Sequence, residues 1–210
     1  MEPSVHEFVK FVEVNKHIST KNEMIAAVSS RFAMARDGRA LFHTDSFAVV
    51  FCYSKNSAFS NAVLSLSKLE KYDGMPCFVV LVRKNLDNVI YLINTTFLDK
   101  ISHSSQNLRA DNIRGSFLGG NIRKELPEIG KRNIPADFDE LFSYHQTFTW
   151  QENIERLVEN TNNIKSNKAK VVLDDAELRN VFEAPERAVR FVTSADYEAC
   201  WQTCGAGARR

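Results

Sequence analysis

The segment 102–124 carries the side chains best suited to binding a polyanion. Guanidinium, ammonium and hydroxyl groups bind phosphate oxygens, and asparagine and glutamine amides pair bidentately with adenine. The side chains that we expect to contact DNA are His103, Ser104, Ser105, Gln106, Asn107, Arg109, Asn112, Arg114, Arg123 and Lys124. The pattern predicts a nucleic-acid contact. The alternative is a solvated loop in which Asp111 pairs with a neighbouring arginine and the amides cap turns.

Charge is segregated along the chain in a way that supports this interpretation. From Lys100 to Arg132 there are seven basic and three acidic residues, a net charge of +4, whereas the 210-residue chain has a net charge of only +1. The region 137–159 that follows is mainly acidic. A polyanion partner is therefore indicated by local clustering of cations and not by the overall charge.

One part of this segment resembles a known kind of protein. The run Ile-Ser-His-Ser-Ser-Gln-Asn-Leu-Arg-Ala-Asp-Asn-Ile-Arg-Gly-Ser-Phe, residues 101–117, resembles segments of bacterial restriction–modification proteins. In those proteins a DNA-recognition region is coupled to a nuclease. The resemblance implies binding of double-stranded DNA and, more distantly, phosphodiester hydrolysis by a type II restriction endonuclease.

Four residues are candidates for a nuclease site of the PD-(D/E)xK kind. Such a site needs two carboxylates and a lysine around Mg²⁺, which together stabilise charge on the scissile phosphate. Asp45 precedes an expected strand and is the candidate first carboxylate and metal ligand; Glu70 or Asp73 would supply the second, and Lys84 the lysine. Because no acid stands two residues before Lys84, the pattern is degenerate. Mg²⁺ is implied only if the chain is a nuclease.

Other motifs of catalysis or metal binding are missing from the sequence. No two of the five histidines have metal-ligand spacing on one helix, and there is no Gly-x-Ser-x-Gly, phosphate-binding or dinucleotide-binding motif. Cys52 and Cys77 lie in apolar runs, which favours buried, reduced thiols, and Cys200 and Cys204 lack zinc spacing. We therefore expect a cytoplasmic protein without structural zinc. No run approaches the roughly 18 apolar residues that span a bilayer.

The periodicity of apolar residues predicts an α/β or α+β fold with a small mixed sheet and flanking helices. Helical spacing is expected at 4–15, from Ser19 or Thr20 to about Asp37, at 57–71, at 137–145 and at 149–164, with one or two helical turns at 95–101. Strands are expected at 47–53, 77–83 and 89–94, the last two paired as a hairpin. The segment 102–132 is polar and glycine-punctuated, and we expect almost no strand in it.

The domain organisation follows from these elements. Residues 1–165 are expected to form one α/β domain that carries the basic loop 102–132, and residues 166–210 a helical extension or the start of a further domain, with helices at 174–182 and 194–204. Two alternatives to a DNA-recognition domain remain open. One is a complete Mg²⁺-dependent nuclease, and the other is a protein-interaction module that uses the acidic helices. The sequence is compatible with a homodimer under each of these hypotheses.

Overall fold

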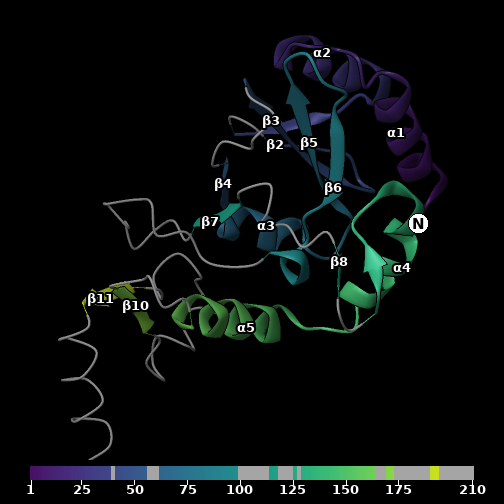
Figure 1. Cartoon of the computed structure of the whole chain (residues 1–210). Coiled ribbons are helices and arrows are strands. Elements are labelled where there is room, and N and C mark those ends of the chain that lie inside the picture. Colours follow the sequence, from purple (N-terminus) through teal and green to yellow (C-terminus); the bar gives the residue numbers. More distant parts are fainter. Residues whose placement is uncertain are drawn as a thin grey trace, which may run out of the picture.

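The computed structural model of the chain (Figure 1) describes residues 1–38, 41–55, 62–98, 114–117, 125–126, 129–163, 169–172 and 190–193. Its centre is a five-stranded mixed sheet with helices on both faces. This confirms the α/β or α+β fold class expected from the sequence.

The sheet has the strand order β1-β2-β3-β5-β6. These strands are β1 (Ala35–Asp37), β2 (Leu41–His43), β3 (Ala48–Ser54), β5 (Cys77–Arg83) and β6 (Val89–Leu92). β3 and β5 are parallel and pair along seven residues, from Ala48 opposite Cys77 to Ser54 opposite Arg83, while every other pairing is antiparallel. The strands expected at 47–53 and 77–83 and the β5–β6 hairpin are therefore confirmed.

One face of the sheet packs against helices α1 (Pro3–Val14), α2 (Lys21–Phe32) and α4 (Phe138–His145). Because side chains alternate along a strand, every second residue of β3 and β5 points to this face. Those side chains are Val49 and Phe51 of β3, with Phe47 just before it, and Phe78, Val80 and Val82 of β5. Phe8 of α1 lies fully buried among them, stacked on Phe47 with ring centroids 4.5 Å apart.

The opposite face packs against α3 (Leu66–Tyr72) and α5 (Trp150–Asn162). Ala48, Val50, Cys77 and Val79 of the two central strands meet Leu69 and Tyr72 of α3 and Ile154 and Leu157 of α5. Both faces of β3 and β5 are thus buried. This explains why the sequences of these two strands are continuous runs of apolar residues.

Helix α2 begins as the sequence predicts and ends earlier than predicted. The Thr20 side chain accepts a hydrogen bond from the backbone N–H of Glu23, which is the N-cap arrangement. The helix ends at Phe32 because Ala33 adopts a left-handed conformation with φ 47°. The residues after it then form β1, so the expectation that the helix reaches Asp37 was wrong.

Two further expectations about local structure are corrected. Residues 62–65, expected to be helical, form β4 (Ala62–Ser65), and only the following residues form α3. The described residues of the segment 102–132 include three short strands, β7 (Arg114–Phe117), β8 (Glu125–Leu126) and β9 (Lys131–Arg132). β4 pairs with β7 and β8 with β9, both antiparallel. β4 and β7 pair across about 50 residues of sequence, a contact that no local periodicity signals, whereas β8 and β9 form a short local pair.

The remaining described elements are short. The single turn η1 (Thr95–Phe97) and the turn η2 (Pro135–Asp137) are 3₁₀-helical, and the helices expected at 137–145 and 149–164 correspond to α4 and α5. Strands β10 (Ala169–Val172) and β11 (Arg190–Thr193) pair antiparallel, and β10 lies against α5. The helices expected at 174–182 and 194–204 lie outside the described residues.

Candidate functional site

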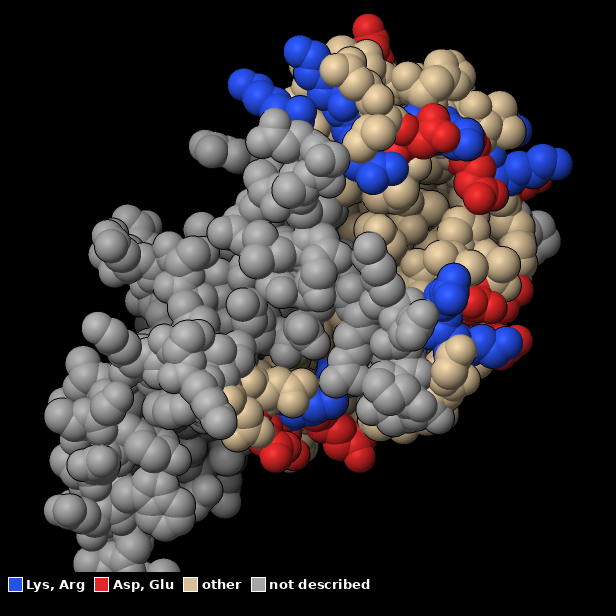
Figure 2. All heavy atoms as spheres, viewed as in Figure 1, with Lys and Arg blue, Asp and Glu red and all other residues tan. Residues whose placement is uncertain are grey.

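Most of the expected DNA-contacting residues lie outside the part of the chain that the structure describes. This holds for His103, Ser104, Ser105, Gln106, Asn107, Arg109, Asn112, Arg123 and Lys124. The exception is Arg114, the first residue of β7, whose backbone pairs with Ser65 of β4. Among the described residues of the view in Figure 2, Lys and Arg gather around α2 and the upper end of β5, and acidic side chains lie along α5.

The structure does not bring the four nuclease candidates together. Asp73 lies before the first residue of β5 and Lys84 follows its last residue, and this seven-residue strand spans about 20 Å. Asp45 is exposed in the turn between β2 and β3, and Glu70 is half-buried on α3. Within the described ranges no three His, Cys, Asp or Glu side chains are grouped so that they could hold a metal ion.

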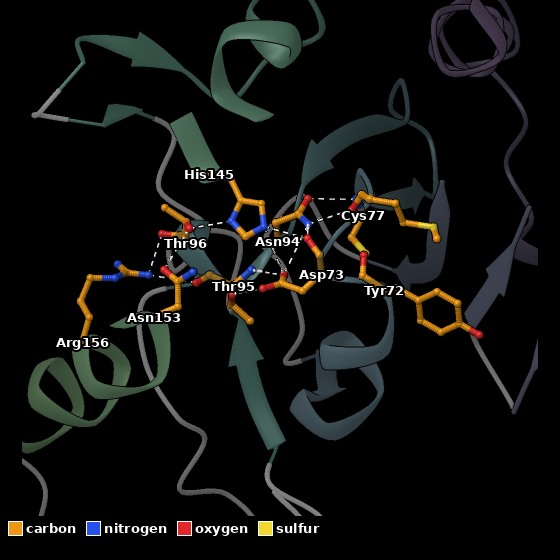
Figure 3. Close-up of polar contacts among 10 residues, drawn as sticks. Tyr72, Asp73, Cys77, Asn94, Thr95, Thr96, His145, Asn153 and Arg156 are labelled. Carbon is orange, nitrogen blue, oxygen red and sulfur yellow. Dashed lines mark hydrogen bonds and ion pairs between the residues drawn. The ribbon is translucent and has the colours of Figure 1, made fainter. Parts of the chain in front are cut away.

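Asp73 instead anchors a buried set of polar side chains, which we call the polar cluster (Figure 3). Its members are Asp73, Asn94, Thr95, Thr96, His145, Asn153 and Arg156, contributed by the α3–β5 turn, the end of β6, η1, α4 and α5. The Asp73 carboxylate accepts hydrogen bonds from the backbone N–H of Thr95 at 2.9 Å and from its hydroxyl at 2.5 Å. Asp73 is 7% exposed and Thr95 is fully buried. A carboxylate this far from water is stabilised by such donors.

Asn94 joins the cluster to the central strand. Its side-chain N–H groups donate to the carbonyl oxygens of Met75 at 2.9 Å and of Asp73 at 3.0 Å. Its side-chain oxygen accepts the backbone N–H of Cys77, the first residue of β5, at 2.9 Å. One buried amide therefore fixes the α3–β5 turn against the end of β6.

His145 extends the cluster to α4. Its Nε2 lies 2.8 Å from the Asp73 carbonyl oxygen and 3.7 Å from a carboxylate oxygen of the same residue. Because a carbonyl oxygen can only accept, Nε2 carries a proton and donates. Nδ1 lies 2.7 Å from the Thr96 hydroxyl oxygen. The imidazole is thus held from both sides.

Helix α5 completes the cluster. The Thr96 hydroxyl donates to the side-chain oxygen of Asn153 at 2.9 Å. One terminal nitrogen of the Arg156 guanidinium donates to the carbonyl oxygens of Thr95 at 2.9 Å and Thr96 at 2.7 Å. The Thr95 carbonyl also accepts the backbone N–H of Leu98 at 3.2 Å, so Arg156 reinforces the single turn η1 and supplies the Thr96 carbonyl with a donor.

The residue types of the polar cluster resemble those of a nucleophile with its base, but the geometry favours a structural role. A nucleophilic hydroxyl must reach a substrate. Thr96 is 5% exposed, and its hydroxyl is already engaged by His145 and Asn153. The cluster therefore fixes residues 94–98, which directly precede the basic segment 102–124. Sequence reasoning missed it, because a Thr-Thr pair and a distant histidine give no recognisable motif.

The chain is fixed a second time where it returns from that segment. The side-chain oxygen of the fully buried Asn133 accepts the backbone N–H of Leu92, and its side-chain N–H donates to the Leu92 carbonyl oxygen, both at 2.8 Å. Asn133 thereby replaces a strand partner along the edge strand β6. Nearby, Lys131 forms ion pairs with Glu140 at 2.9 Å and with Asp137 at 3.9 Å. These carboxylates raise the pKa of the Lys131 ammonium group.

The thiols of β3 and β5 are not suited to chemistry. Burial raises the pKa of Cys52 to about 11 and raises that of Cys77 well above its usual value. Since the thiolate is the reactive species, we expect iodoacetamide at about pH 8 to alkylate Cys52 in the native protein on the order of 100-fold more slowly than in guanidinium chloride. Peptide mass spectrometry after timed quenching measures the two rates. Equal rates would show that the Cys52 thiol is not buried.

No protein-family model, no curated protein and no solved structure matches this chain. Among its described residues, no helix is both long and apolar enough to cross a membrane.

Proposed function

We propose that the chain is the DNA-recognition domain of a restriction-type endonuclease and that it contacts duplex DNA through the segment 102–124. The observation that carries this proposal is the anchoring of the chain on both sides of that segment. Arg156 and the polar cluster hold residues 94–98, and Asn133 holds the returning chain along β6. A cationic segment is thus attached at two fixed points of one sheet edge, and a rigid scaffold of this kind is typical of recognition loops.

The segment 102–124 is cationic even when the ion-paired Lys131 is left out of the count. Lys131 is paired with Glu140 and Asp137, so it adds little to the local field. Residues 100–124 nevertheless hold five basic residues and one acidic residue, a net charge of +4. Phosphate contacts by such cations supply most of the sequence-independent affinity for DNA, and the amides among them can read base edges.

The described contacts favour this proposal over the nuclease alternative and count against an interaction module that uses α4. If an interaction module used α4, the acidic groups of α4 and of the preceding turn η2 should be available to a partner. Asp137 and Glu140 instead pair with Lys131, and Asp139 accepts from His6 at 3.1 Å. On the nuclease hypothesis, Asp73 and Lys84 should face one phosphate, but they lie at opposite ends of β5. We therefore propose DNA binding in the cytoplasm without a catalytic step in this chain.

Replacing Arg109, Arg114, Arg123 and Lys124 together by alanine should weaken duplex binding and its dependence on salt. Each lost phosphate contact reduces the slope of log K against log salt by about 0.9, so four contacts remove about 3.6. Arg109→Ala or Arg114→Ala alone should cost about 1–3 kcal/mol where the arginine is bidentate to a base. Filter binding of a random-sequence duplex over a range of salt concentrations measures both quantities.

A matched control and a cleavage assay make this test decisive. Lys10→Ala with Arg31→Ala removes two exposed cations from α1 and α2 and should leave the slope unchanged. An unchanged slope in the four-residue variant would refute the proposed function. Plasmid DNA incubated with Mg²⁺ should stay intact, whereas cleavage that Asp45→Ala abolishes would establish the nuclease alternative in its place.

A further inference from the structure

A second basic surface lies at the other end of the sheet, away from the polar cluster. It is formed by three connections: residues 15–21, which end at the first residue of α2, residues 54–55 at the end of β3, and residues 83–88, which run from the last residue of β5 to β6. We call this surface the basic edge. The polar cluster meets β5 at Cys77, whereas the basic edge begins at Arg83, so the length of the strand separates the two.

Hydrogen bonds show that the three connections of the basic edge converge. Asn88 is 6% exposed and donates its backbone N–H to the Lys16 carbonyl and its side-chain N–H to the Ile18 carbonyl, both at 2.7 Å. Its side-chain oxygen accepts the backbone N–H of Arg83 at 2.9 Å. The backbone N–H of Lys84 donates to the Ser54 carbonyl at 3.1 Å. The cations of this surface are therefore carried by a fixed backbone.

The charge of the basic edge is strongly positive. Its charged residues are five basic ones, Lys16, Lys21, Lys55, Arg83 and Lys84, and one acidic one, Asp87. The net charge of +4 exceeds the +1 of the whole chain. Asp87 pairs with Lys16 at 2.7 Å, and this ammonium group lowers the pKa of Asp87. The single carboxylate is thus already engaged.

Three of the other cations are available to a partner, while the Arg83 guanidinium donates to the Asp87 carbonyl. Lys55 and Lys84 are exposed and Lys21 is half-buried, and none of the three forms an ion pair with any carboxylate of the described residues. Lys21 is also the first residue of α2, where the helix dipole adds positive potential. In Figure 2 this region belongs to the upper part of the molecule, where Lys and Arg side chains lie around α2 and the end of β5 together with a few acidic side chains.

We propose that the basic edge is a second contact surface for the phosphate backbone of duplex DNA, independent of sequence and with Lys21, Lys55 and Lys84 as its contacting cations. The choice of DNA as the polyanion rests on the proposed function. The three connections contain no Phe, Trp or Tyr that could anchor a lipid interface, and their exposed apolar side chain is Leu86, with Val14 just before residue 15. Vesicle binding therefore serves below as the competing outcome.

The test is a charge reversal confined to the three unpaired lysines. The variant Lys21→Glu, Lys55→Glu, Lys84→Glu should bind a random-sequence duplex about tenfold more weakly or worse at low salt, with a salt slope smaller by about 2.7. Fluorescence anisotropy of a labelled duplex over a salt series measures both. Glutamate in the first turn of α2 suits the helix dipole, so the variant should fold, and circular dichroism checks this.

A matched variant controls for net charge. Lys10→Glu, Arg31→Glu, Lys71→Glu makes the same change in net charge at exposed positions outside the three connections, with Arg31 in the last turn of α2, far from Lys21 in its first. Because it also breaks the ion pair of Lys71 with Asp37, circular dichroism checks the fold of this variant as well. We expect it to retain most of the affinity. An equal loss in both variants would show that only the overall charge matters and would overturn the proposal, as would an unchanged affinity in the edge variant.

The two proposals fail in different ways. If the edge variant loses affinity while the variant of Arg109, Arg114, Arg123 and Lys124 does not, the basic edge stands and the proposed role of segment 102–124 falls. The reverse result overturns the inference about the edge alone. Wild-type protein that co-sediments with phosphatidylserine-containing vesicles but does not bind the duplex would also overturn it.

Discussion

Replacing Asp73 by alanine should lower the free energy of unfolding by about 3–5 kcal/mol, because several buried donors lose their acceptor at once. The Thr95 N–H and hydroxyl both donate to this carboxylate, and both atoms are shut off from water. Each buried hydrogen bond to a charged group contributes about 1.5–3 kcal/mol. Urea unfolding followed by circular dichroism measures the change.

Two control variants test whether the loss of stability comes from the missing buried acceptor of Asp73. Asp73→Asn keeps one oxygen acceptor in the same place and should cost less than the alanine variant. Asp45→Ala removes an exposed carboxylate in the β2–β3 turn and should change stability by no more than about 0.5 kcal/mol. If Asp73→Ala were as mild as Asp45→Ala, the polar cluster would not hold residues 94–98 as described.

Replacing Phe8 by alanine should cost about 3–5 kcal/mol, the range typical of a fully buried phenylalanine. Its ring stacks on Phe47 and lies 5.4 Å from Phe78 and 5.8 Å from Phe32, measured between ring centroids. Removing it leaves a cavity between α1 and the sheet that these rigid rings cannot fill. The same urea titration measures the change.

Phe11, one turn further along α1, provides the comparison for Phe8. It is half-buried, and its described ring contact is the one with Phe32, at 5.6 Å. Phe11→Ala should therefore cost clearly less than Phe8→Ala. Equal costs for the two variants would contradict the packing of α1 on the sheet.

The pairing of β4 with β7 marks the boundary of what local patterns can predict. Ala62–Ser65 continues into a helical spacing of apolar residues, so a single helix was expected there. Arg114–Phe117 contains a glycine and gives no strand signal. Each segment is a strand because the other supplies its hydrogen-bonding partner from about 50 residues away, and tertiary context overrides intrinsic propensity in such cases.

The candidate surfaces divide in a similar way. Clustering of cations along the chain identified the segment 102–124, since its members are neighbours in sequence. The cations of the basic edge, by contrast, are spread over three connections that are distant in sequence, so no short stretch of the sequence contains them together. The degenerate nuclease pattern failed for the converse reason, because Asp73 and Lys84 are close in sequence but an extended strand separates them.

By itself, the sequence determined the helices α1, α4 and α5, the start of α2, and the strands β3, β5 and β6. The spacing of apolar residues shows which side of each element is buried, because the type of each residue depends on whether its own position is buried. Only the tertiary structure decided the strand order, the polar cluster and the basic edge. These depend on which buried donors find which acceptors and which connections meet at one sheet end, and such choices are made between residues that are distant in sequence.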